Sequence, residues 1–198
     1  MTRWLFVRHG ESTANQAQVF SGHTDVPLTP YGRQQAEACG HTLQPRLDGR
    51  TLHAVWSSDL HRATDTAASI LRSAKIMLPV DTHPALREQN LGEWEGQPIA
   101  VVQSQHSQKG SPMAWNRKAP GGESLRDVAR RAVEFLTTVE PKESVLIVGH
   151  GGLLRALLGL IDGVPESEIG ATEIPNAQII TRDLAKDAWS RIAITLLG

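Results

Sequence analysis

The chain has 198 residues, which is enough for one well-buried domain and short for two. Its 20 Lys and Arg balance 21 Asp and Glu, so the formal net charge of -1 gives no support to nucleic-acid binding or to a basic membrane-binding surface. A single cysteine excludes an intramolecular disulfide and a Cys-based zinc site, and no apolar run approaches the roughly 20 residues of a membrane span. We therefore expect one cytoplasmic domain over residues 1–198, with no nucleic-acid or membrane partner.

The first half of the chain alternates short apolar runs with helical patterns. Residues 4–7 are typical of a strand buried on both faces, and the run stops at Arg8-His9-Gly10. Thr29-Pro30 predicts a capped helix start. A second apolar run at 54–56 ends at Ser57-Ser58-Asp59 and leads into an Ala-rich helix.

The middle of the chain is less regular. Residues 78–80 suggest a short strand. Residues 91–122 are rich in Gly, Pro, Ser and Gln, and we interpret them as an insertion that contains a helix near 99–105. Such segments in compact domains often form a functional cap or lid. A further helix is expected over 124–138.

The strongest strand pattern comes late in the chain. It covers residues 144–148 and stops at Gly149-His150-Gly151-Gly152, where a Leu-rich helix begins. Residues 178–181 and 191–196 are expected to be closing strands. Strands that alternate with helices predict an α/β fold, here three α/β/α layers with a mostly parallel central sheet. The insertion is expected to cap the C-terminal edge of the strands.

Three of the expected strands end in polar segments, and ligands in such folds gather at the carboxyl ends of the strands. The segments are Arg8-His9-Gly10, Ser57-Ser58-Asp59 and Gly149-His150-Gly151. A lone histidine is usually structural, but His9 and His150 each follow an apolar run, precede a glycine and stand before an expected helix. Glycine allows a close approach, and the free N–H groups of a helix N-terminus attract anions. This pattern predicts an anion site.

Nearby residue types suit phosphoryl chemistry. Arg8 offers a guanidinium that can grip two phosphate oxygens at once. A neutral imidazole such as that of His9 is a nucleophile, and a covalent intermediate splits a difficult displacement into two easier steps. The leaving alcohol then needs a proton from a general acid. Glu88 is a candidate for that acid, although its spacing fits a solvated surface carboxylate equally well.

Five segments in register resemble the histidine phosphatase superfamily, also called the phosphoglycerate mutase-like family. The segments are Arg8-His9-Gly10-Glu11-Ser12 with Asn15 and Phe20-Ser21-Gly22, residues 57–67, Leu86-Arg87-Glu88 with residues 91–96, Pro120-Gly121-Gly122-Glu123-Ser124, and Val148-Gly149-His150-Gly151-Gly152. They cover nearly the whole chain in order, which is far more specific than one Arg-His-Gly tripeptide.

The resemblance implies a role for each matching residue. His9 matches the phosphorylated nucleophile, and Glu88 matches the proton donor that later activates water. The residues that match the phosphoryl pocket or the loop over it are Arg8, Arg62, His150, Gly151, Asn15, Ser21 and Gly22. Such family members require no metal and no other cofactor, so we expect none.

Three kinds of function fit such a site. In a phosphatase, water attacks phospho-His9, whereas in a cofactor-dependent phosphoglycerate mutase the phosphoryl group returns to a retained substrate. A third kind of member binds or acts on phosphorylated proteins, but such binding-only members usually lack one of the catalytic residues. All of those residues are present here.

Local resemblances favour the phosphatase. The mutases usually have a Tyr where this chain has residues 89–92, and they carry an insertion with an adjacent Arg pair that residues 116–120 match only in part. Residues 91–96 resemble the broad-specificity phosphatases, and residues 21–25 resemble α-ribazole phosphatases, as does the Pro120–Ser124 segment. We therefore expect hydrolysis of a small phosphorylated metabolite, and a homodimer is left open.

Other notable side chains have plainer interpretations. Cys39 is expected to fill the core and Asp59 to cap a helix, while His23 follows the loop at Ser21-Gly22 and is placed to touch a substrate. Trp94 either lines the pocket or anchors the insertion. Trp115, with the neighbouring cations Arg117 and Lys118, either meets a substrate anion or belongs to a solvated loop. The remaining histidines, interpreted as surface or helix residues, are His41, His53, His61, His83 and His106.

Overall fold

A mostly parallel sheet forms the middle layer of the molecule. The computed structural model describes residues 1–106, 114–140 and 142–197. Within them the strands are β1 (Thr2–Arg8), β2 (Ala54–Ser57), β3 (Asp81–Thr82), β4 (Ser144–Gly149) and β5 (Ile179–Leu184). Their order in the sheet is β3-β2-β4-β1-β5, and only β5 runs antiparallel to its neighbour.

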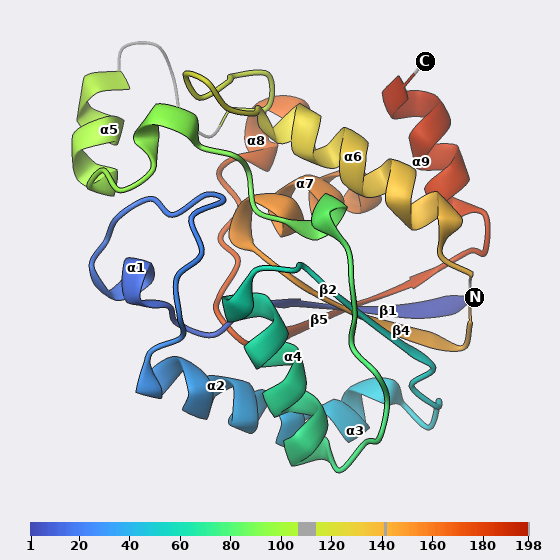
Figure 1. Ribbon diagram of the computed structural model, residues 1–198. Coiled ribbons are helices and arrows are strands. Elements are labelled where there is room, and N and C mark those ends of the chain that lie inside the picture. The colour runs from blue at the N-terminus through green and yellow to red at the C-terminus, as the bar shows by residue number, and fades with distance from the viewer. Residues whose placement is uncertain (107–113, 141, 198) are drawn as a thin grey trace.

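Helices cover both faces of this sheet. They are α1 (Thr13–Gln16), α2 (Pro30–His41), α3 (Leu43–Leu47), α4 (His61–Ala74), α5 (Ile99–His106), α6 (Leu125–Thr138), α7 (Gly151–Asp162), α8 (Glu166–Ile169) and α9 (Ala188–Leu197), with the 3-10 turns η1 (Pro84–Leu86) and η2 (Gly92–Trp94). In Figure 1, α2, α3 and α4 lie on one side of the sheet, and α6, α7 and α9 lie on the other. The predicted three-layer α/β/α fold is confirmed. No helix in the described residues is both long enough and apolar enough to cross a membrane.

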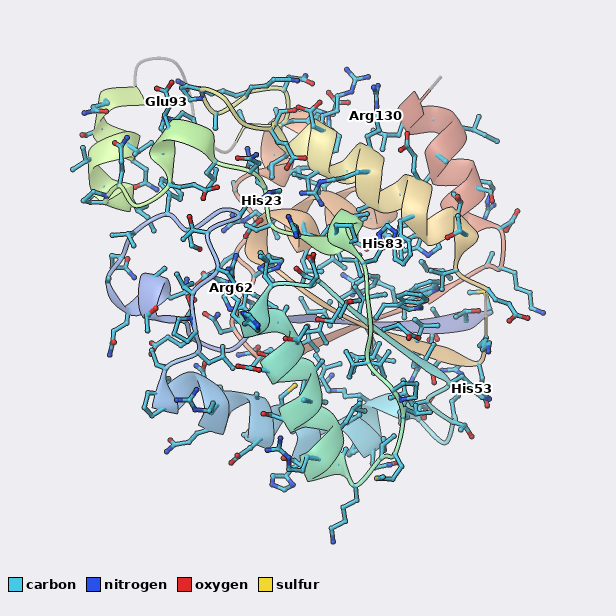
Figure 2. The ribbon with its side chains drawn as sticks, in the orientation of Figure 1. His23, His53, Arg62, His83, Glu93 and Arg130 are labelled. Carbon is cyan, nitrogen blue, oxygen red and sulfur yellow. The ribbon has the colours of Figure 1, made fainter. Side chains whose placement is uncertain are left out.

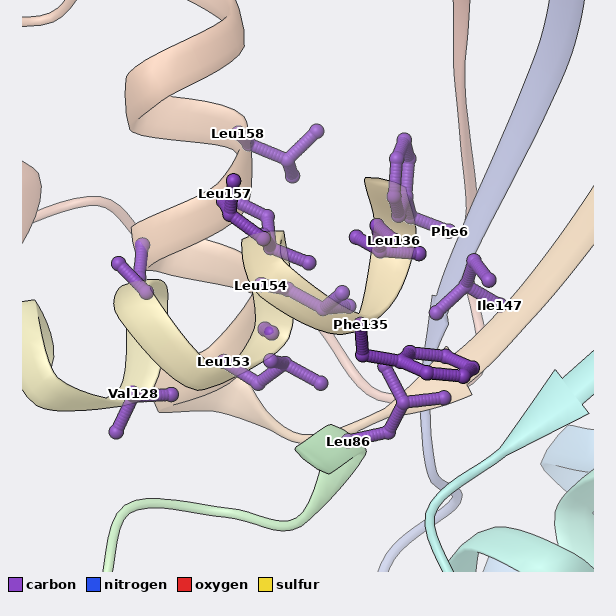
Figure 3. Packing of buried hydrophobic residues seen from close by; sticks show 14 of the residues in the cluster. Phe6, Leu86, Val128, Phe135, Leu136, Ile147, Leu153, Leu154, Leu157 and Leu158 are labelled. Carbon is purple, nitrogen blue, oxygen red and sulfur yellow. The ribbon is translucent and has the colours of Figure 1, made fainter. Parts of the chain in front are cut away.

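The alternation of side chains along β1 explains why both faces are covered. Trp4 and Phe6 belong to the core under α6, α7 and α9, whereas Leu5 and Val7 belong to the core under α2, α3 and α4. Successive side chains of a strand point to opposite faces, so a continuous apolar run demands a layer on each side. Figure 3 shows Phe6 packed in the first of these cores, among leucines of α7 and the α6 residue Leu136.

Two of the expected strands are wrong. Residues 191–196 form most of helix α9, because Trp189, Ile192 and Leu196 recur at helical spacing and pack on the same core. Residues 78–80 form no strand. The strand at this edge of the sheet is β3, which follows them and pairs with β2 over two residues. The other expected strands and helices, including α5 in the insertion, are confirmed to within a few residues.

The insertion at 91–122 has a small core of its own. Its buried members Leu91, Trp94, Val102 and Ala119 pack together, with Phe20 against them. Trp94 is therefore a packing anchor of the insertion. In Figure 1, α5 lies beyond the carboxyl ends of the parallel strands, on the same side as α1. Residues 107–113 of the insertion lie outside the described residues.

Candidate active site

Neighbouring strands place the two predicted histidines side by side. Arg8 at the end of β1 is in register with Gly149 at the end of β4, and the His9 N–H donates to the Gly149 carbonyl at 2.9 Å. The ring centroids of His9 and His150 are 5.2 Å apart, with an interplanar angle of 62°. His9 is 4% exposed and His150 is fully buried. The two strand ends that carry the predicted histidines therefore lie side by side at one edge of the sheet.

The hydrogen bond of His9 identifies its tautomer. Its Nδ1 lies 2.6 Å from the carbonyl oxygen of Gly10. A carbonyl only accepts, so Nδ1 carries the proton and Nε2 carries the lone pair. Burial, together with the positive charges of Arg62 and Arg8, holds the pKa of His9 well below its usual value. The imidazole is therefore neutral, as a nitrogen nucleophile must be.

Within the part of the chain that the structure describes, several buried nitrogens around His9 have no hydrogen-bond partner. They are the Nε atoms of Arg8 and Arg62 and both ring nitrogens of His150. Burial, reinforced by the charge of Arg62, also lowers the pKa of His150 well below its usual value. An unpaired buried polar group is costly, and this cost is relieved by a ligand that accepts several hydrogen bonds. A tetrahedral oxyanion is such a ligand.

The tight turn at residues 21–24 binds the guanidinium of Arg62. Arg62 is fully buried near the start of α4, and it donates to the carbonyl oxygens of Gly22 at 2.7 Å and Thr24 at 2.9 Å. The Thr24 N–H donates to the Ser21 carbonyl at 2.7 Å, which closes the turn. Figure 2 shows Arg62 and the turn residue His23 in the same region, at the left of the sheet. Ser21 and Gly22 thus belong to the arginine's support, and their contact with a phosphate stays a prediction.

Glu88 lies at the N-terminus of α7. Its carboxylate accepts the N–H of Gly152 at 3.0 and 3.1 Å and the N–H of Gln89 at 2.8 Å. A Cβ on Gly152 would stand 2.4 Å from the carboxylate, so any larger residue there would displace the Glu88 side chain. A Cβ on Gly151 would lie 3.5 Å from Arg8 Nε and 3.8 Å from Glu88 Oε2, which places both groups beside Gly151.

Asn15 supports the loop that follows His9, and a residue absent from the sequence predictions, Asn176, supports the His9 backbone. The Asn15 side-chain oxygen accepts the Ser12 N–H at 3.1 Å, so the end of Asn15 that remains for an anion is its amide nitrogen. Asn176 donates to the His9 carbonyl at 2.7 Å. It lies 167 residues from His9, and its only local signal is its position just before the β5 pattern.

Two further acidic residues, which the sequence predictions did not include in the site, hold the segments around it. Glu95 accepts hydrogen bonds from the turn that holds Arg62. Glu123 pairs with Arg131, whose guanidinium also donates to the carbonyl oxygens of Arg87 and Glu88. Both glutamates fall within the segments that carry the family resemblance, and this was the available signal.

The structure decides several of the plainer interpretations. Asp59 is no helix cap: it pairs with Arg87 at 2.7 and 2.6 Å, and the α4 N-cap has no side-chain hydrogen bond. His23 donates from Nε2 to the Glu88 carbonyl at 2.9 Å, which makes it a link between two segments of the site. Cys39 is buried, and burial raises the pKa of its thiol to about 12.

Trp115, Arg117 and Lys118, which belong to the described part of the insertion, have surroundings of three different kinds. Trp115 is buried in the core beneath α6 and α7. Lys118 pairs with Asp127 at 3.1 Å, and Arg117 lines a surface hollow with Glu166 and Ser167. Across the described ranges, no three His, Cys, Asp or Glu side chains are arranged to hold a metal ion.

The chain belongs to the histidine phosphatase superfamily (branch 1), whose family model matches residues 4–195. It is 33% identical to 2,3-bisphosphoglycerate-dependent phosphoglycerate mutase 2 of Gloeobacter violaceus, over 88% of this chain and 82% of the relative. It is also 33% identical to adenosylcobalamin/alpha-ribazole phosphatase of Escherichia coli, over 83% of this chain and 81% of the relative. Since these two relatives are equally similar, family membership leaves phosphatase and mutase activity both open.

Solved structures agree with this assignment. A mycobacterial glucosyl-3-phosphoglycerate phosphatase in complex with VO3 superposes with a TM-score of 0.77 at 30% identity. The match covers 90% of this chain and 91% of that chain.

Proposed function

We propose that this protein is a metal-independent phosphatase that hydrolyses small phosphate monoesters through a phosphohistidine on His9. The observation that carries the proposal is the group of buried, unpartnered nitrogens of Arg8, Arg62 and His150 around a neutral His9. These donors suit a phosphoryl group, whose oxygens accept many hydrogen bonds and whose negative charge the two guanidiniums offset.

In the first step, the Nε2 lone pair of His9 attacks phosphorus in line with the ester oxygen. A nitrogen–phosphorus bond forms while the phosphorus–ester oxygen bond breaks, and the leaving oxygen takes a proton from the Glu88 carboxyl group. The Nδ1–H bond to Gly10 keeps the ring in the reactive tautomer and stabilises the positive charge that develops on it. Arg8, Arg62 and His150 hold the phosphoryl oxygens throughout.

In the second step, the Glu88 carboxylate takes a proton from water. The water oxygen attacks phosphorus, the nitrogen–phosphorus bond breaks, and inorganic phosphate leaves. Glu88 is then protonated and His9 is neutral again, so the cycle closes. The hydrogen bonds from Gly152 and Gln89 keep the carboxylate in one place for both steps.

The surroundings of Arg117 and Lys118, two cations of the insertion within the described residues, support water rather than a retained substrate as the attacking group. A mutase must hold an intermediate while the phosphoryl group changes oxygens, and this requires further cations at the mouth of the site. Lys118 pairs with Asp127, and Arg117 faces a hollow shared with Glu166. A phosphoglycerate mutase remains the second candidate because a relative of that name is 33% identical to the chain.

The first test is a His9→Ala variant assayed with p-nitrophenyl phosphate. Removing a nucleophile lowers kcat by about 10⁴-fold or more, and we expect that loss here with folding intact. Exposed His53→Ala is the matched control and is expected to retain full activity. A phosphate that is acid-labile and base-stable should be trapped on wild-type protein and absent from the variant. Normal hydrolysis by His9→Ala would falsify the proposal.

The second test separates the two candidates. The protein is incubated with 3-phosphoglycerate, with and without 2,3-bisphosphoglycerate, and both phosphate release and 2-phosphoglycerate are measured. Rapid isomerisation without phosphate release would make the mutase the correct function. EDTA is expected to leave hydrolysis unchanged, and loss of activity that a divalent metal restores would refute metal independence.

A further inference from the structure

The turn at Ser21–Thr24 connects three parts of the site. Its carbonyl oxygens hold Arg62, its His23 ring donates to the Glu88 carbonyl, and its N–H groups face Glu95. Glu95 directly follows η2 in the insertion. The turn is therefore the place where the insertion is joined to the proposed phosphoryl pocket.

One peptide unit spans the distance between Glu95 and Arg62. The His23 N–H donates to Glu95 Oε1 at 2.8 Å, and the Gly22 carbonyl of the same peptide accepts from Arg62 at 2.7 Å. The N–H and C=O of a trans peptide point in opposite directions, so the carboxylate, the peptide and the guanidinium form one aligned chain. A hydrogen-bonded chain between opposite charges polarises its members and strengthens each bond.

The conformation of the turn depends on this carboxylate. Gly22 has φ +47°, and a Cβ there would stand 2.1 Å from Glu95 Oε1. Glu95 also accepts the Thr24 N–H at 2.9 Å and the Thr24 hydroxyl at 2.6 Å. The Leu91 N–H, at 3.2 Å, adds a fourth donor from the insertion. These hydrogen bonds lower the pKa of Glu95 against the effect of burial, so it is ionised in the folded protein.

Glu95 differs in this respect from Glu123. Glu123 is paired directly with Arg131, at 2.9 and 3.0 Å. Each of the donors that hold Glu95 is neutral, and its negative charge reaches Arg62 through the Gly22–His23 peptide. Burial lowers the pKa of the Arg62 guanidinium, and the negative charges of Glu88, Asp25 and Glu95 oppose that shift.

We propose that Glu95 is a positioning residue, which aims Arg62 at the phosphoryl group through the Gly22–His23 peptide. The inference rests on the proposed phosphoryl chemistry at His9. Glu95 itself touches no reacting atom. Without its carboxylate the turn loses the contact that orients its carbonyls, and Arg62 loses its fixed direction. A displacement of a binding group by about 1 Å costs up to about 100-fold in rate.

The test compares Glu95→Gln with Glu93→Gln. Glu93 is an exposed carboxylate of η2, two residues away, and serves as the matched control. For each variant, kcat and KM are measured with p-nitrophenyl phosphate, orthovanadate binding by calorimetry, and folding by thermal unfolding. We expect Glu95→Gln to lower kcat/KM about 10- to 100-fold and to weaken vanadate binding about 10-fold, with little effect of Glu93→Gln.

A double-mutant cycle with Arg62→Lys separates positioning from general damage. Lysine lacks the planar fork with which Arg62 reaches the two turn carbonyls from separate nitrogens, so in this background Glu95→Gln is expected to cost less than about 3-fold. An equal loss in both backgrounds, or activity of Glu95→Gln equal to that of Glu93→Gln, would overturn the inference. If Glu95→Gln does not fold, Thr24→Val removes only one donor to Glu95. That variant is expected to lose about 3-fold in wild type and nothing in Arg62→Lys, and an unchanged rate in wild type would likewise overturn it.

These outcomes are distinct from a failure of the proposed function. Wild-type protein that neither hydrolyses p-nitrophenyl phosphate nor binds vanadate would reject the phosphatase itself. Wild-type protein that does both, beside a Glu95→Gln variant that matches its control, would reject only the role of Glu95.

Discussion

Arg131 and Arg62 have opposite environments, although both lie near Glu88. Arg131 on α6 makes five hydrogen bonds, two to Glu123 and three to the carbonyls of Ala85, Arg87 and Glu88. Arg62 on α4 is more deeply buried, yet its Nε has no partner and its other contacts are two carbonyls of one turn. Arg131 is complete without a ligand, whereas Arg62 is not.

This difference distinguishes an arginine that supports the surrounding backbone from an arginine that is available to bind a ligand. A guanidinium whose donors are all occupied fixes the segments around it, and here Arg131 holds the backbone on both sides of Glu88. A buried guanidinium with an open donor costs free energy until an acceptor arrives. Proteins retain such costs where a ligand repays them. Arg8, Arg62 and His150 contribute four such atoms around His9, and we infer that this cluster marks the proposed pocket, whereas isolated unpartnered atoms such as Trp189 Nε1 do not.

Substitution of each arginine by methionine tests the difference between Arg62 and Arg131 and should give the largest effects. Arg62→Met is expected to lower kcat/KM about 10³-fold, because a fixed donor to the transition state is lost. The free energy of unfolding is expected to change by less than about 1 kcal/mol, because relief of the buried charge offsets the loss of the donor to the Gly22 and Thr24 carbonyls. Arg131→Met is expected to lower the free energy of unfolding by about 2 kcal/mol, since Glu123 and three carbonyls lose their partner. Urea unfolding and p-nitrophenyl phosphate kinetics measure both quantities. Equal effects of the two variants on rate and stability would remove the distinction.

A smaller effect is expected from the two glycines at the start of α7. A Cβ on Gly152 collides with the Glu88 carboxylate, whereas one on Gly151 makes ordinary contacts with Arg8 and Glu88. Gly152→Ala is therefore expected to displace Glu88 and lower kcat about 100-fold. Gly151→Ala should leave kcat within about 10-fold and act mainly on KM, because its methyl group stands beside the proposed pocket. A larger loss of kcat in Gly151→Ala than in Gly152→Ala would show that the N–H groups of α7 do not fix the position of Glu88.

The smallest effect concerns the two buried imidazoles. The pKa values of His9 and His150 in the folded protein lie well below the usual 6.5, so the unfolded chain binds more protons as the pH falls past that value. Their contribution to stability is complete above about pH 6.5 and is lost on acidification, with a slope of up to about 1.4 kcal/mol per pH unit for each histidine. Urea unfolding at several pH values should show a shallower dependence for His150→Asn than for wild type. Added phosphate should reduce the wild-type slope, because a bound anion favours the imidazolium form.

The local part of the site was predictable from the sequence and the long-range part was not. Arg8-His9-Gly10 and Gly149-His150-Gly151 stand at the ends of continuous apolar runs, and such runs become neighbouring buried strands. Asn176 meets His9 from 167 residues away, and no local pattern records such a contact. Residues 191–196 were mistaken for a strand because a short apolar run fits either structure until its packing partner, here the core under α6, is known.

The position of β1 in the sheet has a consequence for folding during synthesis. β1 is synthesised before β4 and β5, yet it pairs with β4 on one side and β5 on the other, and both of those strands lie more than 130 residues later in the chain. Strand pairing over such sequence separations is slow, and nascent chains emerge from the N-terminus onward. His9 therefore meets His150 and Asn176 only after these later segments have been synthesised. A nascent chain that ends before β4 contains the proposed nucleophile but lacks the strand end that places His150 beside it.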